Sequence, residues 1–94
     1  MKIISFQVES AMRQRAQQRA DVEGRPLANW VAHHCAAAVQ HLPPSLGELP
    51  APLQPSQLFI RNEALRETVQ VLAETNKTSV RVVMTHLLKI ALAQ

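Results

Sequence analysis

The stretch Lys2–Glu9 constrains the fold most strongly, because apolar and polar residues alternate along it. One face of this stretch carries β-branched and aromatic residues: Ile4, Phe6 and Val8. The other face carries mostly small or polar residues: Ile3, Ser5 and Gln7. This period of two predicts a half-buried strand. Because a lone strand leaves its backbone groups unpaired, we expect an antiparallel partner strand, and the short run Gln57–Arg61 is the best candidate.

Size and composition indicate one small cytoplasmic domain. The 94 residues are enough for one core but too few for two independent ones. Lys and Arg number 10 against 7 Asp and Glu, and the resulting net charge of +3 is only a weak sign of nucleic-acid binding. The single cysteine, Cys35, cannot form an internal disulfide, and no apolar run predicts a signal peptide or a membrane span. With no Tyr and few other aromatic residues, base stacking on an aromatic surface is disfavoured.

The first strand is followed by a predicted pair of helices. Ser10 is a plausible N-cap for a helix that runs to about Glu23, and Gly24 ends that helix in a left-handed conformation. Its narrow apolar seam consists of Met12, Ala16, the stem of Arg19, and Ala20. Pro26 suits the first turn of a second helix, which reaches about Leu42. The apolar residues of this helix recur at spacings of three and four: Leu27, Trp30, Val31, His34, Cys35, Ala38 and Val39.

A proline-rich segment separates this half from a second one with the same plan. Residues 43–56 hold most of the prolines and predict a stiff, extended linker. After the strand Gln57–Arg61, Asn62 is a good N-cap for a helix that ends near Asn76, which we expect in a left-handed turn. Thr78 or Ser79 then caps a last helix. Its apolar face comprises Val80, Val83, Met84, Leu87, Leu88, Ala91 and Leu92.

The two halves match at a constant offset, which indicates an internal duplication. An offset of 53 maps Met12 to Leu65, Ala16 to Val69, Leu27 to Val80, Trp30 to Val83, Val31 to Met84 and Cys35 to Leu88. In the strands, an offset of 53 would turn Leu58 and Ile60 outward, whereas 52 buries both. We prefer 52, because burial of Leu58 and Ile60 completes the core and leaves Gln57, Phe59 and Arg61 outside.

These patterns predict a mainly α fold with a two-stranded antiparallel β-ribbon, built from two tandem β-α-α units. The first unit spans residues 1–42, the linker spans 43–56 and the second unit spans 57–94. A two-stranded ribbon is marginal alone, and one unit of about 40 residues has too little core to fold independently. We therefore expect the two units to interlock as one intertwined domain. The tether gives each unit an effective concentration of the other on the order of mM, which favours the internal partner.

The order of strand, helix, turn and helix resembles the ribbon-helix-helix family of DNA-binding proteins, which includes the methionine and Arc repressors. The resemblance rests on Ile-Ser-Phe-Gln-Val-Glu-Ser-Ala-Met followed by Glu-Gly-Arg-Pro-Leu-Ala-Asn-Trp-Val. It covers Lys2–Leu42 well and Gln57–Ala93 less well. Members dimerise, each chain giving one strand to a shared ribbon. Two copies in one chain look like the less common single-chain form found among accessory proteins of plasmid transfer, so the resemblance implies a monomeric pseudo-dimer.

Within this resemblance, the outer face of the ribbon is expected to read double-stranded DNA in the major groove, which admits a two-stranded ribbon. The candidate base-reading residues are Ile3, Ser5, Gln7, Gln57, Phe59 and Arg61. Gln can pair with adenine, Arg with guanine and Ser with either, while Ile3 and Phe59 suit thymine methyl groups. The starts of the second helices would present backbone N–H groups and positive charge to phosphates. The candidate phosphate-binding residues are Lys2, Arg25, Leu27, Lys77, Thr78 and Ser79.

Several of these residues also have simpler interpretations. By itself, a Ser and Gln strand face is often simply the solvated face of a sheet, and Phe59 is also compatible with a core position. Arg13, Arg15 and Arg19 fit a solvated helix face better than a phosphate clamp. No metal ligand, cofactor or enzymatic activity is expected: His33, His34 and Cys35 lack the helical spacing of metal ligands, and no nucleophile–base or paired-carboxylate arrangement is present.

The leading functional hypothesis is a sequence-specific DNA-binding protein, either a transcriptional repressor or an accessory factor of plasmid transfer. Because the two strands differ, its DNA site should be asymmetric. One alternative is an antitoxin-like or other protein-interaction module that uses Pro43–Pro55 as a docking strip. Another keeps the fold but forms a homodimer between two chains, and a homodimer or higher assembly on DNA is compatible with either arrangement.

Overall fold

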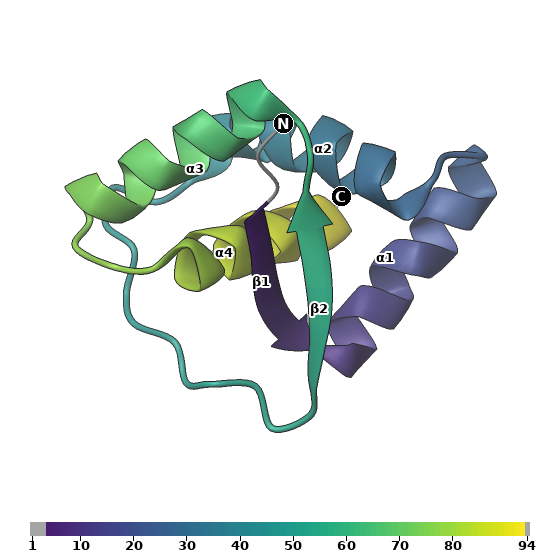
Figure 1. Ribbon diagram of the computed structural model, residues 1–94, viewed down its shortest axis with the longest axis horizontal. Helices are drawn as coiled ribbons and strands as arrows, with labels where there is room; N and C mark the ends of the chain where they lie inside the picture. The colour runs from purple at the N-terminus through teal and green to yellow at the C-terminus, as the bar shows by residue number, and fades with distance from the viewer. Residues whose placement is uncertain (1–3, 94) are drawn as a thin grey trace.

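The computed structural model describes residues 4–93 and has a mainly α fold with one two-stranded antiparallel sheet, as predicted (Figure 1). The elements in chain order are β1 Ile4–Glu9, α1 Ser10–Glu23, α2 Leu27–Ala38, a 3₁₀ turn Val39–His41, β2 Pro55–Ile60, α3 Glu63–Thr75 and α4 Val80–Ala93. Within the described range, no helix combines the length and apolarity needed to cross a bilayer. Lys2 and Ile3, both predicted to contact DNA, lie outside the described residues.

The two strands pair in antiparallel fashion, and the pairing places Phe6 directly opposite Leu58. Strand β2 begins at Pro55, ahead of the predicted Gln57, and ends at Ile60. The inner face of the ribbon is buried at Phe6, Val8, Leu58 and Ile60. The preference for burying Leu58 and Ile60 is therefore confirmed. This burial leaves the intervening side chains on the opposite, outer face.

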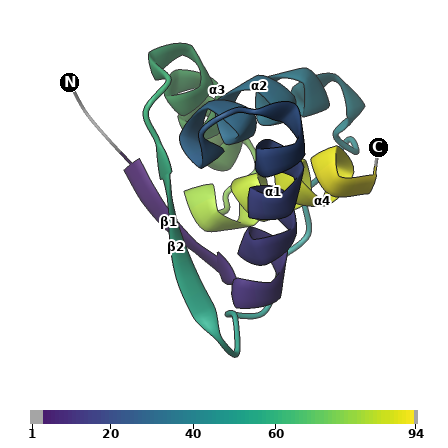
Figure 2. The same ribbon diagram turned by 90° about the vertical axis from the view of Figure 1, so that its right-hand side faces the viewer.

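The four helices lie on the inner side of the ribbon and enclose the core (Figure 2). Helices α2 and α4 pack against each other, α4 also contacts β1, and α2 also contacts β2. The largest fully buried side chains belong mainly to these two helices and include Trp30, Met84, Leu87 and Leu88. Val82 is also fully buried, although the predicted apolar face of the last helix omitted it. The strands alone could not exclude water from one face, so this helical layer is what stabilises the ribbon.

The first helix begins differently from the prediction. Ser10 was expected to cap α1, but it is the first residue of the helix, and Glu9 occupies the N-cap position without a side-chain hydrogen bond to the first turn of the helix. The Ser10 hydroxyl instead donates to the carbonyl of Gln54 at 2.9 Å, and the Ser10 backbone N–H donates to the same carbonyl at 2.9 Å. A hydrogen bond to a linker residue that is distant in sequence therefore takes the place of the expected N-cap hydrogen bond.

The turns between the helices share one geometry in the two halves. Gly24 has φ 68°, as expected, but the left-handed residue of the second turn is Lys77 with φ 54°. Asn76 has φ −93°, so the prediction of a left-handed Asn76 is wrong. Arg25 N–H donates to the Ala20 carbonyl at 2.9 Å, and Thr78 N–H donates to the Ala73 carbonyl at 2.9 Å. Gly24 and Lys77 are separated by the offset of 53 that matches the helices.

The remaining helix ends agree with the prediction in part. Asn62 caps α3 as expected, since its side-chain oxygen accepts from Leu65 N–H at 2.9 Å. Ser79 caps α4, its hydroxyl oxygen accepting from Val82 N–H at 3.3 Å. Pro26 occupies the N-cap position of α2 rather than its first turn. Helix α2 ends at Ala38 and continues only as a 3₁₀ turn, so it does not reach Leu42 as an α-helix.

The linker between the halves packs against the helical layer rather than standing free. Leu46 is buried, and its N–H donates to the Asn76 side-chain oxygen at 3.4 Å. The Arg81 guanidinium on α4 donates to the carbonyls of Leu49 at 2.9 Å and Pro50 at 3.1 Å. After these contacts, the linker runs past α4 and reaches the start of β2 (Figure 1).

Candidate nucleic-acid interface

The outer face of the ribbon is open to solvent, because the helices lie on its other side (Figure 2). Every described candidate for base reading is exposed: Ser5, Gln7, Gln57, Phe59 and Arg61. Phe59 is 44% exposed, so the alternative that it tucks into the core is wrong. The pleat of the ribbon therefore gathers residues from both halves of the sequence on one surface.

Two cross-strand pairs form the centre of this surface. Gln7 lies directly opposite Gln57, and Ser5 lies directly opposite Phe59. Directly opposed residues in an antiparallel ribbon have Cβ atoms about 4.5 to 5.5 Å apart. The surface thus presents two amide groups side by side, with a hydroxyl and an aromatic ring next to them. Amides can donate to and accept from base edges at the same time, which suits bidentate pairing with adenine.

The charge near this surface is mostly positive. Arg61 follows directly after β2 and is exposed. Arg13 on α1 donates from Nε to the Gln57 carbonyl at 3.2 Å, so it lies beside the ribbon rather than on a distant helix face. Glu9, at the far end of β1, accepts from the N–H groups of Leu53 at 2.6 Å and Gln54 at 3.4 Å. These donors partly offset the negative charge that Glu9 brings to the edge of the surface.

The first predicted phosphate site, at Arg25 and Leu27, lies at the start of α2. Leu27 and Ala28 line a hollow of about 160 Å³ together with Phe59 and Arg61, so the start of α2 is adjacent to β2. The first N–H groups of a helix have no intrahelical acceptor and remain available to an anion. The Arg25 N–H is used in the preceding turn, and its side chain is half-exposed with Nε 3.3 Å from Glu23 Oε1. Leu27 fits the predicted role better than the backbone of Arg25 does.

At the second predicted phosphate site, formed by Lys77, Thr78 and Ser79, more of the polar groups already make hydrogen bonds within the protein than at the first site. Thr78 N–H already donates to the Ala73 carbonyl, so this backbone group is not available to a phosphate, and the phosphate-binding role of Thr78 stays a prediction. The Thr78 hydroxyl donates to Glu48 Oε1 at 3.3 Å, which places a carboxylate where a phosphate would approach. The Ser79 hydroxyl caps α4. Lys77 stays exposed, so its charge is the main attraction this site offers to an anion.

A polar cluster joins α2 to the end of α1. Glu23 accepts from Trp30 Nε1 at 2.8 Å, and both of its oxygens lie 2.9 Å from His34 Nε2. The hydrogen bond with His34 is the largest cause that lowers the pKa of Glu23, with Trp30 and the charge of Arg25 adding to it against a smaller opposing effect of burial. His34 therefore makes a helix contact. Among residues 4–93, no group of three or more His, Cys, Asp or Glu gathers as metal ligands would.

The sequence analysis missed one residue of this surface, Arg13, which it assigned to a solvated helix face. The available signal was its position in the first turn of the helix that directly follows β1, from which a long side chain can reach the ribbon.

No family model, curated protein or solved structure matches the chain.

Proposed function

We propose that the protein binds double-stranded DNA sequence-specifically by inserting the β1–β2 ribbon into the major groove. The observation that carries this proposal is a two-stranded ribbon with one face packed on helices and the other exposed, with Gln7 opposite Gln57 at its centre. The major groove is wide enough for such a ribbon, and its base edges present a distinct donor and acceptor pattern for each base pair. Arg61 and Arg13 add positive charge beside the ribbon, which favours approach to phosphates.

We further infer that the chain consists of two tandem strand-helix-helix units in a pseudo-dimer. Equivalent turn hydrogen bonds support this inference, since the bond from Arg25 to Ala20 recurs from Thr78 to Ala73 at the offset of 53. The strand register supports it as well. An approximate two-fold axis between Phe6 and Leu58 would relate residues 52 apart, the offset that buries both strands' apolar faces. Each second helix packs on the other unit's strand, so the units interlock.

The biological role that fits this proposal is that of a transcriptional repressor or an accessory factor of plasmid transfer, as the family resemblance implies. Pairing of β1 with β2 inside one chain favours the monomeric form over a homodimer between two chains. The alternative of a protein-docking strip in the linker remains a hypothesis. Part of that strip already contacts α4 through Leu49 and Pro50, and Leu46 is buried, which reduces the surface it offers to a partner.

A binding-site selection followed by affinity measurements tests the proposal. Duplexes enriched from a random pool would be titrated with wild type, Gln7→Ala and Arg61→Ala, using fluorescence anisotropy at several salt concentrations. A bidentate base contact contributes about 1 to 3 kcal/mol, so each variant should bind the selected duplex roughly 5- to 150-fold more weakly. The affinity should also fall steeply with salt, in proportion to the number of phosphates contacted.

Gln14→Ala and Arg15→Ala serve as matched controls, because both residues are exposed on α1 and neither lies on the strands. These two substitutions remove an amide and a guanidinium, the same groups that Gln7→Ala and Arg61→Ala remove, but from the surface of a helix. We expect control affinities within about twofold of wild type, which corresponds to about 0.4 kcal/mol. Equal binding by wild type, Gln7→Ala and Arg61→Ala would remove the ribbon from DNA recognition.

A further inference from the structure

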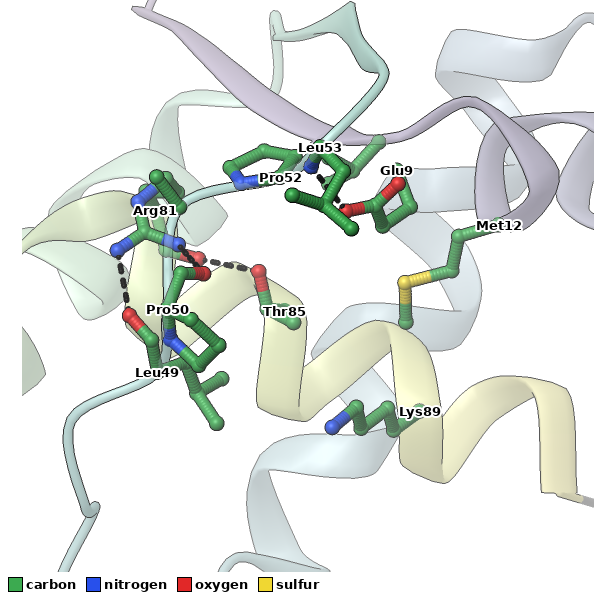
Figure 3. A pocket seen from close by; sticks show the side chains of 11 residues that line it. Glu9, Met12, Leu49, Pro50, Pro52, Leu53, Arg81, Thr85 and Lys89 are labelled. Atoms are coloured by element: carbon green, nitrogen blue, oxygen red, sulfur yellow. Dashed lines mark hydrogen bonds between the residues drawn. The ribbon is translucent and has the colours of Figure 1, made fainter.

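A pocket of about 330 Å³ lies on the helix side of the ribbon, between the linker and α4 (Figure 3). Its apolar walls come from β1, α1 and the linker, through Val8, Met12, Leu49, Pro52 and Leu53. This volume falls within the range of about 300 to 1,000 Å³ that is typical of small-molecule sites. None of these residues belongs to the proposed DNA-reading face, so the pocket needs a separate explanation.

The pocket is held open by a polar contact between the linker and α4. Both terminal nitrogens of Arg81 donate to the linker, to the Leu49 carbonyl at 2.9 Å and the Pro50 carbonyl at 3.1 Å. The Thr85 hydroxyl donates to the Arg81 carbonyl at 2.7 Å along the same helix. These two hydrogen bonds fix the position of the linker wall, and the positive charge of Arg81 remains, because no salt bridge among residues 4–93 engages it.

Lys89 supplies a positive charge that the protein leaves uncompensated. Its side chain extends along the pocket from α4, while Glu9 and Leu53 lie on the opposite side (Figure 3). Across residues 4–93, no salt bridge engages Lys89. Glu9 does not compensate it, since its carboxylate accepts from the Leu53 and Gln54 N–H groups. An anion could therefore bind at Lys89 without breaking an internal ion pair.

Leu53 supplies an apolar surface that the protein leaves exposed. It is 93% exposed although it lines the pocket, so a ligand that covered it would gain from removing apolar area from water. The three polar residues that α4 contributes to the pocket also lack polar counterparts in α2. At the offset of 53, Arg81, Thr85 and Lys89 correspond to Ala28, Ala32 and Ala36. Helix α2 forms with alanine at the three equivalent positions. The polar side chains of Arg81, Thr85 and Lys89 are therefore not needed to form the helix.

We propose that this pocket binds a small amphiphilic carboxylate. The carboxylate lies beside Lys89, and the apolar portion lies between Met12 and the linker residues Pro52 and Leu53. Arg81, Lys89 and Glu9 line the pocket and together give it one net positive charge, which matches a single negative charge on the ligand. A dianion such as a phosphate monoester fits less well, because Glu9 on the opposite wall would repel the additional charge.

Titration of the full chain with octanoate, 1-octanol and octylammonium tests this proposal, with amide NMR shifts as the readout. Octanoate should shift the signals of Leu53, Thr85 and Lys89 to saturation, 1-octanol should bind more weakly, and octylammonium should bind most weakly. Lys89→Gln should weaken octanoate binding about fivefold, as expected for a partly exposed ion pair, and leave 1-octanol unchanged. Leu53→Ser should weaken both, with little effect on folding because the side chain is solvated.

Arg15→Gln is the matched control for loss of one positive charge, since Arg15 is exposed and does not line the pocket. It should bind octanoate as wild type does. Octanoate binding that is absent, or that is unchanged in Lys89→Gln and Leu53→Ser, would overturn the proposed site. Equal or tighter binding of 1-octanol or octylammonium would overturn the assignment to a carboxylate. The titration contains no DNA, so its outcome is independent of the proposed DNA binding.

Discussion

Adjacent residues of β2 should differ sharply in their contribution to stability, because one faces the core and the next faces solvent. Leu58 is 3% exposed and lies opposite Phe6, whereas Gln57 is exposed on the outer face. Leu58→Ala removes the γ and both δ carbons from the core. About 0.8 kcal/mol per buried methylene, together with a cavity term, places the cost at about 2.5 to 4 kcal/mol. In a domain of this size, the melting temperature should fall by about 10 to 30 °C.

Thermal unfolding followed by circular dichroism, with urea denaturation as a second measurement, would test this contrast. Gln57→Ala is the matched comparison, and its effect should stay within about 0.5 kcal/mol because the side chain is solvated. Its backbone carbonyl, which accepts from Arg13, is retained. A slip of one residue in the strand register would exchange the two faces. Equal destabilisation by the two variants, or greater destabilisation by Gln57→Ala, would contradict the register.

Three further predictions concern a helix cap, the acidic cluster and the buried thiol. Asn62→Ala should lower the free energy of unfolding by about 1 kcal/mol in urea titrations, because Leu65 N–H loses its acceptor. The pKa of Glu23 is lowered in the folded state, chiefly by His34, so its contribution to stability is complete above the ordinary carboxyl pKa of 4.5 and is lost as the pH falls through the lowered value. Glu23→Gln should therefore flatten the acid side of a stability–pH curve. Burial raises the pKa of Cys35 to about 12, so native protein should react with a thiol reagent far more slowly than urea-unfolded protein does.

Local sequence patterns were sufficient for much of the fold. Alternation in β1 predicted which side chains face the core, and burial of Leu58 and Ile60 then determined the register of β2. Gly24 and Asn62 were predictable for a similar reason, since a left-handed turn and an N-cap each depend on one residue and its immediate neighbours. The exposure of the candidate base-reading residues followed from the same alternation.

Contacts between distant segments were not predictable from local patterns. Ser10 resembles an N-cap, but its hydroxyl bonds to Gln54 across the domain. Asn76 has the intrinsic preference for a left-handed turn, yet Lys77 adopts it. The Asn76 side chain contacts Leu72 and Leu46 instead, which favours a different backbone conformation for that residue. The pocket between the linker and α4 was missed for the same reason, because it exists only where the linker packs on α4.

The central claim is that the outer face of the ribbon contacts DNA, and amide chemical-shift mapping on the selected duplex tests it most directly. We predict that the largest shifts fall on Ser5, Gln7, Gln57, Phe59 and Arg61, and that they diminish as salt weakens the complex. The exposed surfaces of α1 and α3 that face away from the ribbon should change little. Shifts confined to those helices, with the strand signals unmoved by saturating DNA, would contradict the account.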